Sequence, residues 1–222
     1  MKLITLIIPA KNEILSLGKV LIELSKYSSI SEIIVVVDSP DDTSISIAKK
    51  FNCKIIVQKN SGYGSAIIEG FKNANTEYAC IFNADYSFDP IYLQNMIELT
   101  EKYDFIFGSR YEKNGSSEDD DLITLFGNTI FSFMSKILLK IKLSDILYTY
   151  VLCNVSEFNK IIFKNKDFRF CIELPFQIEN KKLTYAGISM VERKRFAGKK
   201  NVNVIKDGFL ILIEIINSFL RK

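Results

Sequence analysis

Histidine is absent from the 222-residue sequence, and cysteine is scarce. Without an imidazole, the chain cannot form a Ser-His-Asp triad, a Cys-His pair or a histidine-ligated metal site. Chemistry must therefore use carboxylates, amides, lysine, arginine, hydroxyl groups or the backbone. The four cysteines are far apart and show no CxxC spacing, which argues against a zinc or redox motif. They are Cys53, Cys80, Cys153 and Cys171, and we expect buried, reduced thiols in a cytoplasmic protein.

Long apolar runs and a large charge excess are also missing. No segment approaches the roughly 18 uninterrupted apolar residues of a membrane span. The N-terminal run in MKLITLIIPAKNE is too short for the core of a signal peptide, so we interpret it as a buried strand. The formal net charge of +3 does not indicate a nucleic-acid-binding protein. Residues 193–206 are locally basic, however, with no acidic residue among them, which suggests a phosphate ligand or an anionic surface.

What the sequence does contain is a regular alternation of apolar runs and amphipathic stretches. Hydrophobic residues make up 48% and charged residues 25% of the chain, which indicates a globular protein. The strand-like runs are continuously apolar and rich in Val and Ile, as expected where helices cover both faces of a sheet. An α/β fold with a mostly parallel sheet and right-handed crossovers follows. We predict strands at 3–9, 31–38, 53–58, 78–83 and 104–109, and helices at 15–27, 43–51, 64–73 and 90–101.

The pattern changes after Arg110. Residues 111–121 (YEKNGSSEDDD) are polar and acidic, which predicts a mobile loop. A mostly apolar helix with lysines toward its end is expected at 122–142, and a second, amphipathic helix at 207–222. Two interpretations of these helices stay open. They either pack on the core or lie on a membrane, with the apolar face down and the lysines at the headgroups.

The carboxyl ends of the predicted strands are rich in polar and glycine residues. In open α/β sheets, ligands bind in the crevice beyond these ends. Because five such ends meet at one edge of the sheet, the sequence predicts a binding site there. The five segments are 9–13, 38–42, 60–64, 83–85 and 108–110.

The segment CIFNADYSFDP, residues 80–90, places polar side chains directly after a buried strand. Asn83 and Asp85 lie two residues apart, so in an extended chain they point to the same side. Their oxygens could then share one hard cation that bridges the oxygens of a diphosphate. The alternative is an ordinary turn after a strand, where Asn and Asp are common.

Three further features suit an anionic ligand, and each also has a plain structural explanation. Gly62 and Gly64 precede a predicted helix, where backbone amides can approach an anion or where a tight turn simply needs glycine. Arg110 directly follows a strand and could fork onto a phosphate, or be an ordinary surface arginine. The basic residues around Arg195 and Lys199 either close over the same ligand or form a solvated loop.

Taken together, these segments resemble glycosyltransferase family 2. The similarity runs in the right order over about residues 3–208, so it is more specific than any single motif. IIPAKNE is similar to the family's opening I-P-A-Y-N-E, and NADYSFDP to its metal motif D-A-D-x-x-x-x-P. The other matching segments are VVVDSPDDT, GYGSAIIEGF, GSRY, LSDILYTYVLCN and FCIELPFQIENKKLTYAGISMVERKRFAGKK. Within the family, the branch of dolichol-phosphate mannose synthase and bacterial polyprenyl-phosphate glycosyltransferases is the most similar.

The resemblance implies a GT-A fold and the inverting transfer of a sugar from a UDP- or GDP-linked donor. On matching positions, it implies an acceptor phosphate on Arg110, and the donor diphosphate with Mg²⁺ or Mn²⁺ at Asn83, Ala84 and Asp85. An acceptor phosphate is already a nucleophile, so this branch needs alignment and charge neutralisation but no catalytic base. The remaining donor contacts are expected at Pro9, Ala10, Asn12, Glu13, Asp38, Gly64, Arg195 and Lys199.

The implied organisation is a single domain, 1–222, with a nucleotide-sugar half at 1–110, an acceptor half at 111–206 and an amphipathic helix at 207–222. The expected partners are the donor and a lipid-phosphate or saccharide acceptor, without nucleic acid. The expected location is the cytoplasm, with peripheral contact at the inner face of the cell membrane.

The sequence departs from the family pattern in its metal motif. The first acid is replaced by Asn83, so we expect weaker metal binding, with Asp85 as the main protein ligand. Two alternatives stay open. One is transfer to a sugar hydroxyl, which requires a base, with Asp145 or Glu173 as the candidates. The other is a degenerate protein that binds a nucleotide or a protein partner without turnover.

Overall fold

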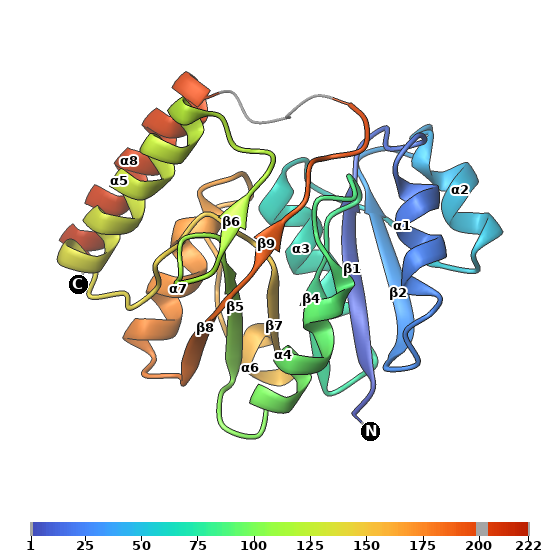
Figure 1. Ribbon diagram of the computed structural model, residues 1–222, viewed down its shortest axis with the longest axis horizontal. Helices are drawn as coiled ribbons and strands as arrows, with labels where there is room; N and C mark the ends of the chain where they lie inside the picture. The colour runs from blue at the N-terminus through green and yellow to red at the C-terminus, as the bar shows by residue number, and fades with distance from the viewer. Residues whose placement is uncertain (1, 199–203, 222) are drawn as a thin grey trace.

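A seven-stranded sheet forms the centre of the computed structural model, which describes residues 2–198 and 204–221 (Figure 1). The strand order is β3-β2-β1-β4-β7-β5-β8, and neighbours are parallel except at β7, which runs antiparallel to β4 and β5. The strands are β1 (Ile4–Ala10), β2 (Ile30–Val37), β3 (Lys54–Val57), β4 (Tyr78–Ile81), β5 (Phe105–Ser109), β7 (Val151–Asn154) and β8 (Tyr185–Ser189). A second sheet pairs β6 (Ser116–Ser117) with β9 (Val191–Glu192).

Helices cover both faces of the main sheet because its strands bury side chains on both sides. Along β1, Ile7 packs into one apolar cluster, while Leu6 and Ile8 pack into a second cluster on the other face. The predicted α/β class is therefore confirmed. The helices that complete the layers are α1 (Leu17–Leu24), α2 (Ser44–Lys50), α3 (Tyr63–Lys72), the 3₁₀ turn η1 (Pro90–Tyr92), α4 (Leu93–Leu99), α6 (Val155–Asn159) and α7 (Phe170–Asn180).

The elements predicted in the first half of the chain are all present, with ends shifted by a few residues. The predicted helix at 90–101 starts as a 3₁₀ turn, because the side chain of Asp89 accepts a hydrogen bond from the backbone N–H of Ile91 at 2.9 Å. Periodicity does not predict β7, which is only four residues long and ends in a polar residue, Asn154. This antiparallel strand is the one that joins β4 to β5 across the sheet.

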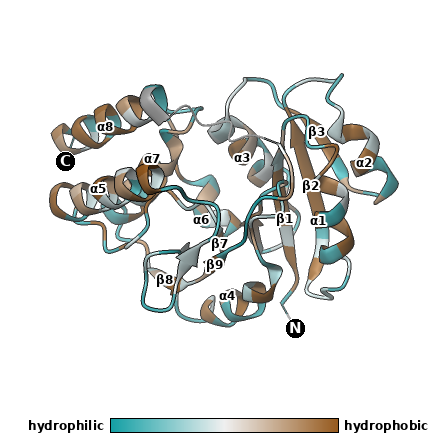
Figure 2. Ribbon diagram, turned by 45° about the horizontal axis from the view of Figure 1, so that its top comes forward, coloured by the Kyte–Doolittle hydropathy of each residue, from teal (hydrophilic) through white to brown (hydrophobic). Residues whose placement is uncertain are grey.

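Two long helices, α5 (Leu122–Leu138) and α8 (Val204–Leu220), pack against each other at one end of the molecule (Figure 1). Their buried sides carry polar groups: Ser132 and Ser135 in α5, Glu214 and Ser218 in α8. Ile211 and Ile215 also reach the core, and Phe131 packs against it, but several large apolar side chains are exposed. Apolar residues occur along both helices (Figure 2). Core packing thus accounts for one side of these helices, whereas the other side, the outward face, stays exposed. Its exposed residues include Leu122, Ile123, Phe126, Phe133 and Ile137 from α5, and Phe209, Ile216, Phe219 and Leu220 from α8.

Among the helices that the structure describes, none combines the length and apolarity needed to cross a bilayer. The four cysteines are free thiols, of which Cys80, Cys153 and Cys171 are buried and Cys53 is half-buried. Burial raises the pKa of each thiol, to about 11 for Cys53, so all four stay protonated near neutral pH. A thiolate nucleophile is therefore not available at rest.

Candidate active site

A cleft of about 470 Å³ opens at the carboxyl edge of the main sheet. It lies where β1, β2, β4 and β5 end, which is the edge that the sequence predicts for a ligand. Further walls come from α3, from the start of α5 and from the segment after β9. The expected site residues that line it are Pro9, Ala10, Glu13, Asp38, Asn83, Ala84, Asp85, Arg110 and Arg195.

Asp38, just beyond β2, collects three hydrogen bonds at one end of the cleft. Lys11 Nζ donates to Asp38 Oδ2 at 2.9 Å, while Ser61 Oγ and Gln58 Nε2 donate to Oδ1 at 2.8 and 2.5 Å. These donors, Lys11 foremost, lower the pKa of Asp38, so the carboxylate is ionised at neutral pH. An ionised carboxylate in a cleft is an acceptor for the N–H groups of a base or the hydroxyls of a ribose.

Asn83 and Asp85 are linked through Ser87. The Ser87 hydroxyl donates to Asp85 Oδ1 at 2.7 Å, and the Ser87 backbone N–H donates to the same oxygen at 3.0 Å. The Ser87 hydroxyl donates its one proton to the carboxylate of Asp85. Its oxygen can therefore only accept a hydrogen bond from Asn83, whose Nδ2 lies 3.3 Å away. This bond turns Asn83 Oδ1 away from Ser87. It also explains structurally why position 83 holds an amide. An aspartate at position 83 has no proton to donate here.

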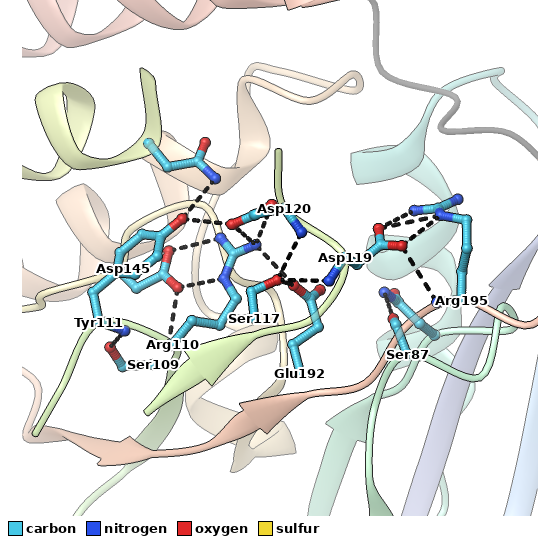
Figure 3. A network of polar contacts seen from close by, with 12 residues as sticks. Ser87, Ser109, Arg110, Tyr111, Ser117, Asp119, Asp120, Asp145, Glu192 and Arg195 are labelled. Carbon is cyan, nitrogen blue, oxygen red and sulfur yellow. Dashed lines mark hydrogen bonds and ion pairs between the residues drawn. The ribbon is translucent and has the colours of Figure 1, made fainter. Parts of the chain in front are cut away.

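Arg195 faces Asp85 from the segment that follows β9. Its Nη2 lies 3.5 Å from Asp85 Oδ2. The same nitrogen lies 3.1 Å from Asp119 Oδ2 (Figure 3). Its Nε also donates to both carboxylate oxygens of Asp119, at 3.3 and 3.2 Å. Burial alone would lower the pKa of Arg195, but Asp119 and Asp85 raise it, so the guanidinium stays charged. One guanidinium is thus shared by two carboxylates.

Arg110, just beyond β5, is only 7% exposed and is surrounded by carboxylates (Figure 3). Its Nε and Nη2 form a two-pronged ion pair with Asp145 at 2.7 and 3.0 Å, and Nη1 lies 3.2 Å from both Asp120 and Glu192. Burial alone would lower the pKa of Arg110, but Asp145 foremost raises it well above its usual range. Burial also raises the pKa of Glu192. All three nitrogens of the guanidinium are occupied.

The segment 111–121 is hydrogen-bonded to the rest of the protein, which differs from the free loop that its polarity predicts. β6 in its middle pairs with β9, and Ser117 Oγ accepts the backbone N–H groups of Asp119 and Asp120 at 3.2 and 3.0 Å. Asp119, Asp120 and Glu192 line the cleft without having been among the expected site residues. The signal for the two aspartates is the acidic run SSEDDD soon after an arginine at a strand end.

Asn12 and Gly64, both expected at the donor, do not line the cleft. Asn12 is exposed in a turn with a φ of 57°, and its backbone N–H donates to the carboxylate of Asp42. Gly64 is buried in α3, where a Cβ would lie 2.7 Å from Phe170 Cβ, so its hydrogen permits close helix packing. Gly62 lines the cleft instead, with a φ of 126° that L side chains rarely adopt.

The two carboxylates expected as bases for a hydroxyl acceptor are buried and hydrogen-bonded. Asp145 is 1% exposed and is held by Arg110. Glu173, in α7, is 0% exposed and accepts N–H bonds from residues 164–165. Neither of them lines the cleft. Lys199, the remaining expected site residue, lies outside the residues that the structure describes.

Acidic side chains outnumber basic ones among the described residues that line the cleft. Carboxylate and amide oxygens of this kind fit a hard divalent cation such as Mg²⁺ or Mn²⁺. The described part of the chain holds no group of three or more acidic or cysteine side chains that could bind a metal alone. A cation at Asp85 would therefore need oxygens from a ligand. The basic residues are Lys11, Arg110 and Arg195, and the acidic ones are Glu13, Asp38, Asp85, Asp119, Asp120 and Glu192.

The fold and the cleft define an α/β protein of the GT-A type, with its polar site beyond the carboxyl ends of parallel strands. Residues 5–162 match Glycosyl transferase family 2, and the chain belongs to this family. It is 32% identical over 124 residues to "Dolichol-phosphate mannosyltransferase" from Pyrococcus furiosus, which covers 52% of this chain and 35% of that protein. It is 25% identical over 135 residues to "Dolichyl-phosphate hexose transferase" from Haloferax volcanii, covering 60% of this chain and 58% of that protein. The matched region thus spans only part of each relative.

Solved structures agree on the fold. Glucosyl-3-phosphoglycerate synthase from Mycobacterium tuberculosis, in complex with Mn²⁺, UDP and phosphoglyceric acid, matches 98% of this chain and 78% of its own. The TM-score is 0.76 and the identity 12%. The same synthase in complex with Mg²⁺ and UDP gives a TM-score of 0.74 and 12% identity. At this identity the likeness shows the fold alone, and it confirms the GT-A architecture that the motifs imply.

Proposed function

We propose that this protein is an inverting glycosyltransferase that moves a sugar from a UDP- or GDP-linked donor to a polyprenyl phosphate or a related membrane-associated acceptor. The observation that carries the proposal is the convergence of Asp38, Asp85 and Arg195 on one cleft beyond the strand ends of a GT-A sheet. The names of the two archaeal relatives support the acceptor class. The UDP in the similar solved structures supports the donor class.

The donor is proposed to bind with its base and ribose at Asp38 and its diphosphate at Asp85 and Arg195. Pro9 and Ala10 form an apolar wall beside Asp38, which suits the face of a base. The guanidinium of Arg195 supplies charged donors for phosphate oxygens. The two ends of the cleft thus differ in chemistry in the same way as the two ends of a nucleoside diphosphate.

In the proposed reaction, an oxygen of the acceptor phosphate forms a bond to the anomeric carbon as the bond to the nucleoside diphosphate breaks. Attack from the opposite face inverts the configuration. The acceptor phosphate is already ionised, so no proton has to be removed. The burial of Asp145 and Glu173 therefore favours a phosphate acceptor over a sugar hydroxyl, which would need a base. Arg195 stabilises the charge that grows on the leaving diphosphate.

Mg²⁺ or Mn²⁺, when bound, would neutralise part of the charge on the leaving diphosphate. Asp85 would hold it with a carboxylate oxygen and Asn83 with its amide Oδ1, while the donor phosphates complete the oxygen set. The surplus of acidic side chains in the cleft supports this assignment, because a dianionic diphosphate needs additional positive charge to enter.

Asn83→Asp is expected to lower the Mn²⁺ concentration for half-maximal donor binding by about ten-fold, because a second unit charge faces the cation. The lost bond to Ser87 reduces this gain but does not cancel it. Calorimetry with UDP and GDP over a range of Mn²⁺ concentrations measures the midpoint. Asn180→Asp, which adds the same charge at the exposed end of α7, is the matched control. An unchanged midpoint in Asn83→Asp would contradict the assignment.

The outward face of α5 and α8 is the proposed membrane contact. Both helices bury serines and expose several large apolar side chains, unlike a helix that only packs on a core. Phe126 is 69% and Phe133 is 63% exposed, and exposed lysines lie near the end of α5. A contiguous apolar face beside lysines suits the boundary between headgroups and acyl chains. This face also starts beside the cleft, since Thr124 and Asn128 of α5 line it.

The double variant Phe126→Ser/Phe133→Ser is expected to weaken vesicle binding at least about ten-fold, because burying one phenylalanine contributes roughly 1.5–3 kcal/mol. Co-sedimentation with vesicles of phosphatidylcholine and phosphatidylglycerol gives the partition coefficient. Ile22→Ser is the control, since Ile22 is 55% exposed on α1, which lies far from α5 (Figure 1). Equal partitioning of the double variant and the control would remove the membrane contact from the proposal.

Transfer itself is tested with radiolabelled UDP- and GDP-hexoses and a short polyprenyl phosphate in detergent, with and without Mn²⁺. The proposal expects a labelled lipid product from one of the two nucleotide classes. The degenerate alternative expects nucleotide binding without loss of donor over a long incubation. Labelling of a saccharide acceptor in place of the lipid would favour transfer to a hydroxyl.

A further inference from the structure

Two consecutive aspartates of one loop form ion pairs with the two arginines of the cleft. Asp119 pairs with Arg195 and Asp120 pairs with Arg110, so the short segment between β6 and α5 reaches both (Figure 3). The proposed function places the donor diphosphate at Arg195, and the resemblance to family 2 implies an acceptor phosphate at Arg110, which we adopt here. The loop carboxylates therefore lie where substrate phosphates have to bind.

The contact at Arg195 has the geometry with which arginine binds phosphate. Nε and Nη2 both reach Asp119 Oδ2, at 3.2 and 3.1 Å, and the backbone N–H of Arg195 donates to Asp119 Oδ1 at 3.3 Å. Carboxylates and phosphates present oxygens that match the same guanidinium fork. A phosphate can replace Asp119 without rearrangement of the arginine, which makes the two direct competitors.

At Arg110 the loop contacts only Nη1, the nitrogen of the guanidinium that Asp145 does not bind. Asp145 binds Nε and Nη2, whereas Asp120 and Glu192 approach Nη1. Asp120 also accepts a hydrogen bond from the Tyr111 hydroxyl at 2.8 Å. Withdrawal of Asp120 would leave Nη1 paired with Glu192, while Asp145 keeps the guanidinium in place.

The charge balance makes this competition strong. The two guanidinium groups lie within ion-pair distance of five carboxylates: Asp85 and Asp119 at Arg195, and Asp120, Asp145 and Glu192 at Arg110. A diphosphate that enters this arrangement meets an excess of negative charge in a poorly solvated site, which disfavours its binding. Removing the loop carboxylates reduces that excess at both arginines at once.

The loop is attached in a way that allows the two aspartates to leave together. Asp119 and Asp120 both donate their backbone N–H groups to Ser117 Oγ, so one hydroxyl sets both positions. Immediately after them, Asp121 caps α5 by accepting from the backbone N–H of Thr124 at 2.7 Å. A shift of the start of α5 therefore moves both carboxylates.

We propose that Asp119 and Asp120 act as an internal phosphate mimic, which competes with substrate phosphates for Arg195 and Arg110 and leaves the cleft when they bind. This inference rests on the proposed function, because it assigns substrate phosphates to these arginines. The inference also distinguishes Asp119 from a metal ligand. A metal ligand would be needed for cation-dependent binding of the donor, whereas the mimic opposes binding of the donor.

Asp119→Asn is the direct test, because an amide keeps the size of the side chain but loses the charge that holds Arg195. Calorimetry with inorganic pyrophosphate, UDP and GDP, each without a divalent cation and with Mn²⁺, gives the affinities. We expect all detectable affinities to rise by about five- to ten-fold, as for the loss of one close competing charge. In an Arg195→Gln background, the same substitution is expected to produce no gain.

Asp121→Asn is the matched control. It removes one negative charge from the same loop, but Asp121 does not line the cleft, and asparagine is as good a helix cap as aspartate. An equal gain in this control would reduce the effect to general electrostatics and overturn the proposal. So would a weaker Mn²⁺-dependent affinity in Asp119→Asn, which would make Asp119 a cation ligand.

The same binding measurements separate the phosphate mimic from the donor site. If the wild-type protein binds UDP or GDP but Asp119→Asn does not bind it more tightly, the mimic is wrong and the proposed donor site stands. If the wild-type protein shows no binding, the mimic requires that Asp119→Asn binds one of the probes measurably. If neither protein binds any of the probes, the nucleotide-diphosphate site itself is wrong.

Discussion

Asp85→Asn is expected to reduce sugar transfer by about 100- to 1,000-fold, the range found when one electrostatic stabiliser of a transition state is removed. Asp85 is the carboxylate proposed to hold the cation, and its Oδ2 faces Arg195 while Oδ1 is held by Ser87. An asparagine can still accept the Ser87 bonds through its oxygen, so the turn is preserved. The expected loss therefore comes from the missing charge at the diphosphate and its cation.

The measurement for Asp85→Asn is the rate of transfer at saturating donor, together with the melting temperature. Asp104→Asn makes the same chemical change at the opposite edge of the sheet, where Asp104 accepts from the backbone N–H and hydroxyl of Thr184. It is expected to leave kcat unchanged. Transfer at more than about a third of the wild-type rate in Asp85→Asn would mean that this carboxylate is not part of the reaction centre.

Arg110→Leu is expected to lower the free energy of unfolding by about 3–5 kcal/mol, because it leaves a buried carboxylate without its partner. The side chain of Asp145 is 0% exposed, and those of Asp120 and Glu192 are 6% and 9% exposed. None of the three can recover its hydration without opening the structure. In a chain of this size, the loss corresponds to a fall in Tm of roughly 10 °C.

Arg169→Leu is the control for Arg110→Leu. Arg169 pairs with Asp167 at 2.8 Å, but the two side chains are 31% and 40% exposed, so water replaces the lost partner. Its removal is expected to cost less than about 1 kcal/mol. Urea denaturation of both variants gives the free energies of unfolding. Similar small losses in both would show that the cluster around Arg110 does not depend on the arginine for its stability.

The first half of the chain, residues 1–110, could be predicted from the sequence because its signals are local. Continuous apolar runs give buried strands, and a polar group directly after a strand must lie at the carboxyl edge of a parallel sheet. Asp38, Asn83 and Asp85 therefore reach the cleft as expected. Asn12 and Gly64 do not, because backbone conformation and close packing determine their positions, and a motif does not specify either.

The ion pairs of Asp119 with Arg195 and of Glu192 with Arg110 could not be predicted because they join residues that are distant in sequence. Glu192 meets Arg110 across 82 positions, and Asp119 meets Arg195 across 76. A run of acidic residues has the same composition whether it is solvated or bound to arginine. For the helices at 122–142 and 207–222, the hydrophobic pattern shows an apolar face but not the direction in which it points. In the structure, apolar side chains lie on both sides of these helices, some in the core and some exposed, and serines are buried among the former.

The central claim is a cation-dependent site for a nucleoside diphosphate in the cleft between Asp38 and Asp85. Thermal unfolding with UDP and with GDP, each with and without Mn²⁺, tests it most directly. A nucleotide at about 100 times its Kd stabilises the fold by about 2.7 kcal/mol, so we expect Tm to rise by about 5 °C or more for one of the two nucleotides. The rise should require Mn²⁺ and disappear in Asp85→Asn. An unchanged Tm with both nucleotides, in the presence of Mn²⁺ and in its absence, would contradict the claim.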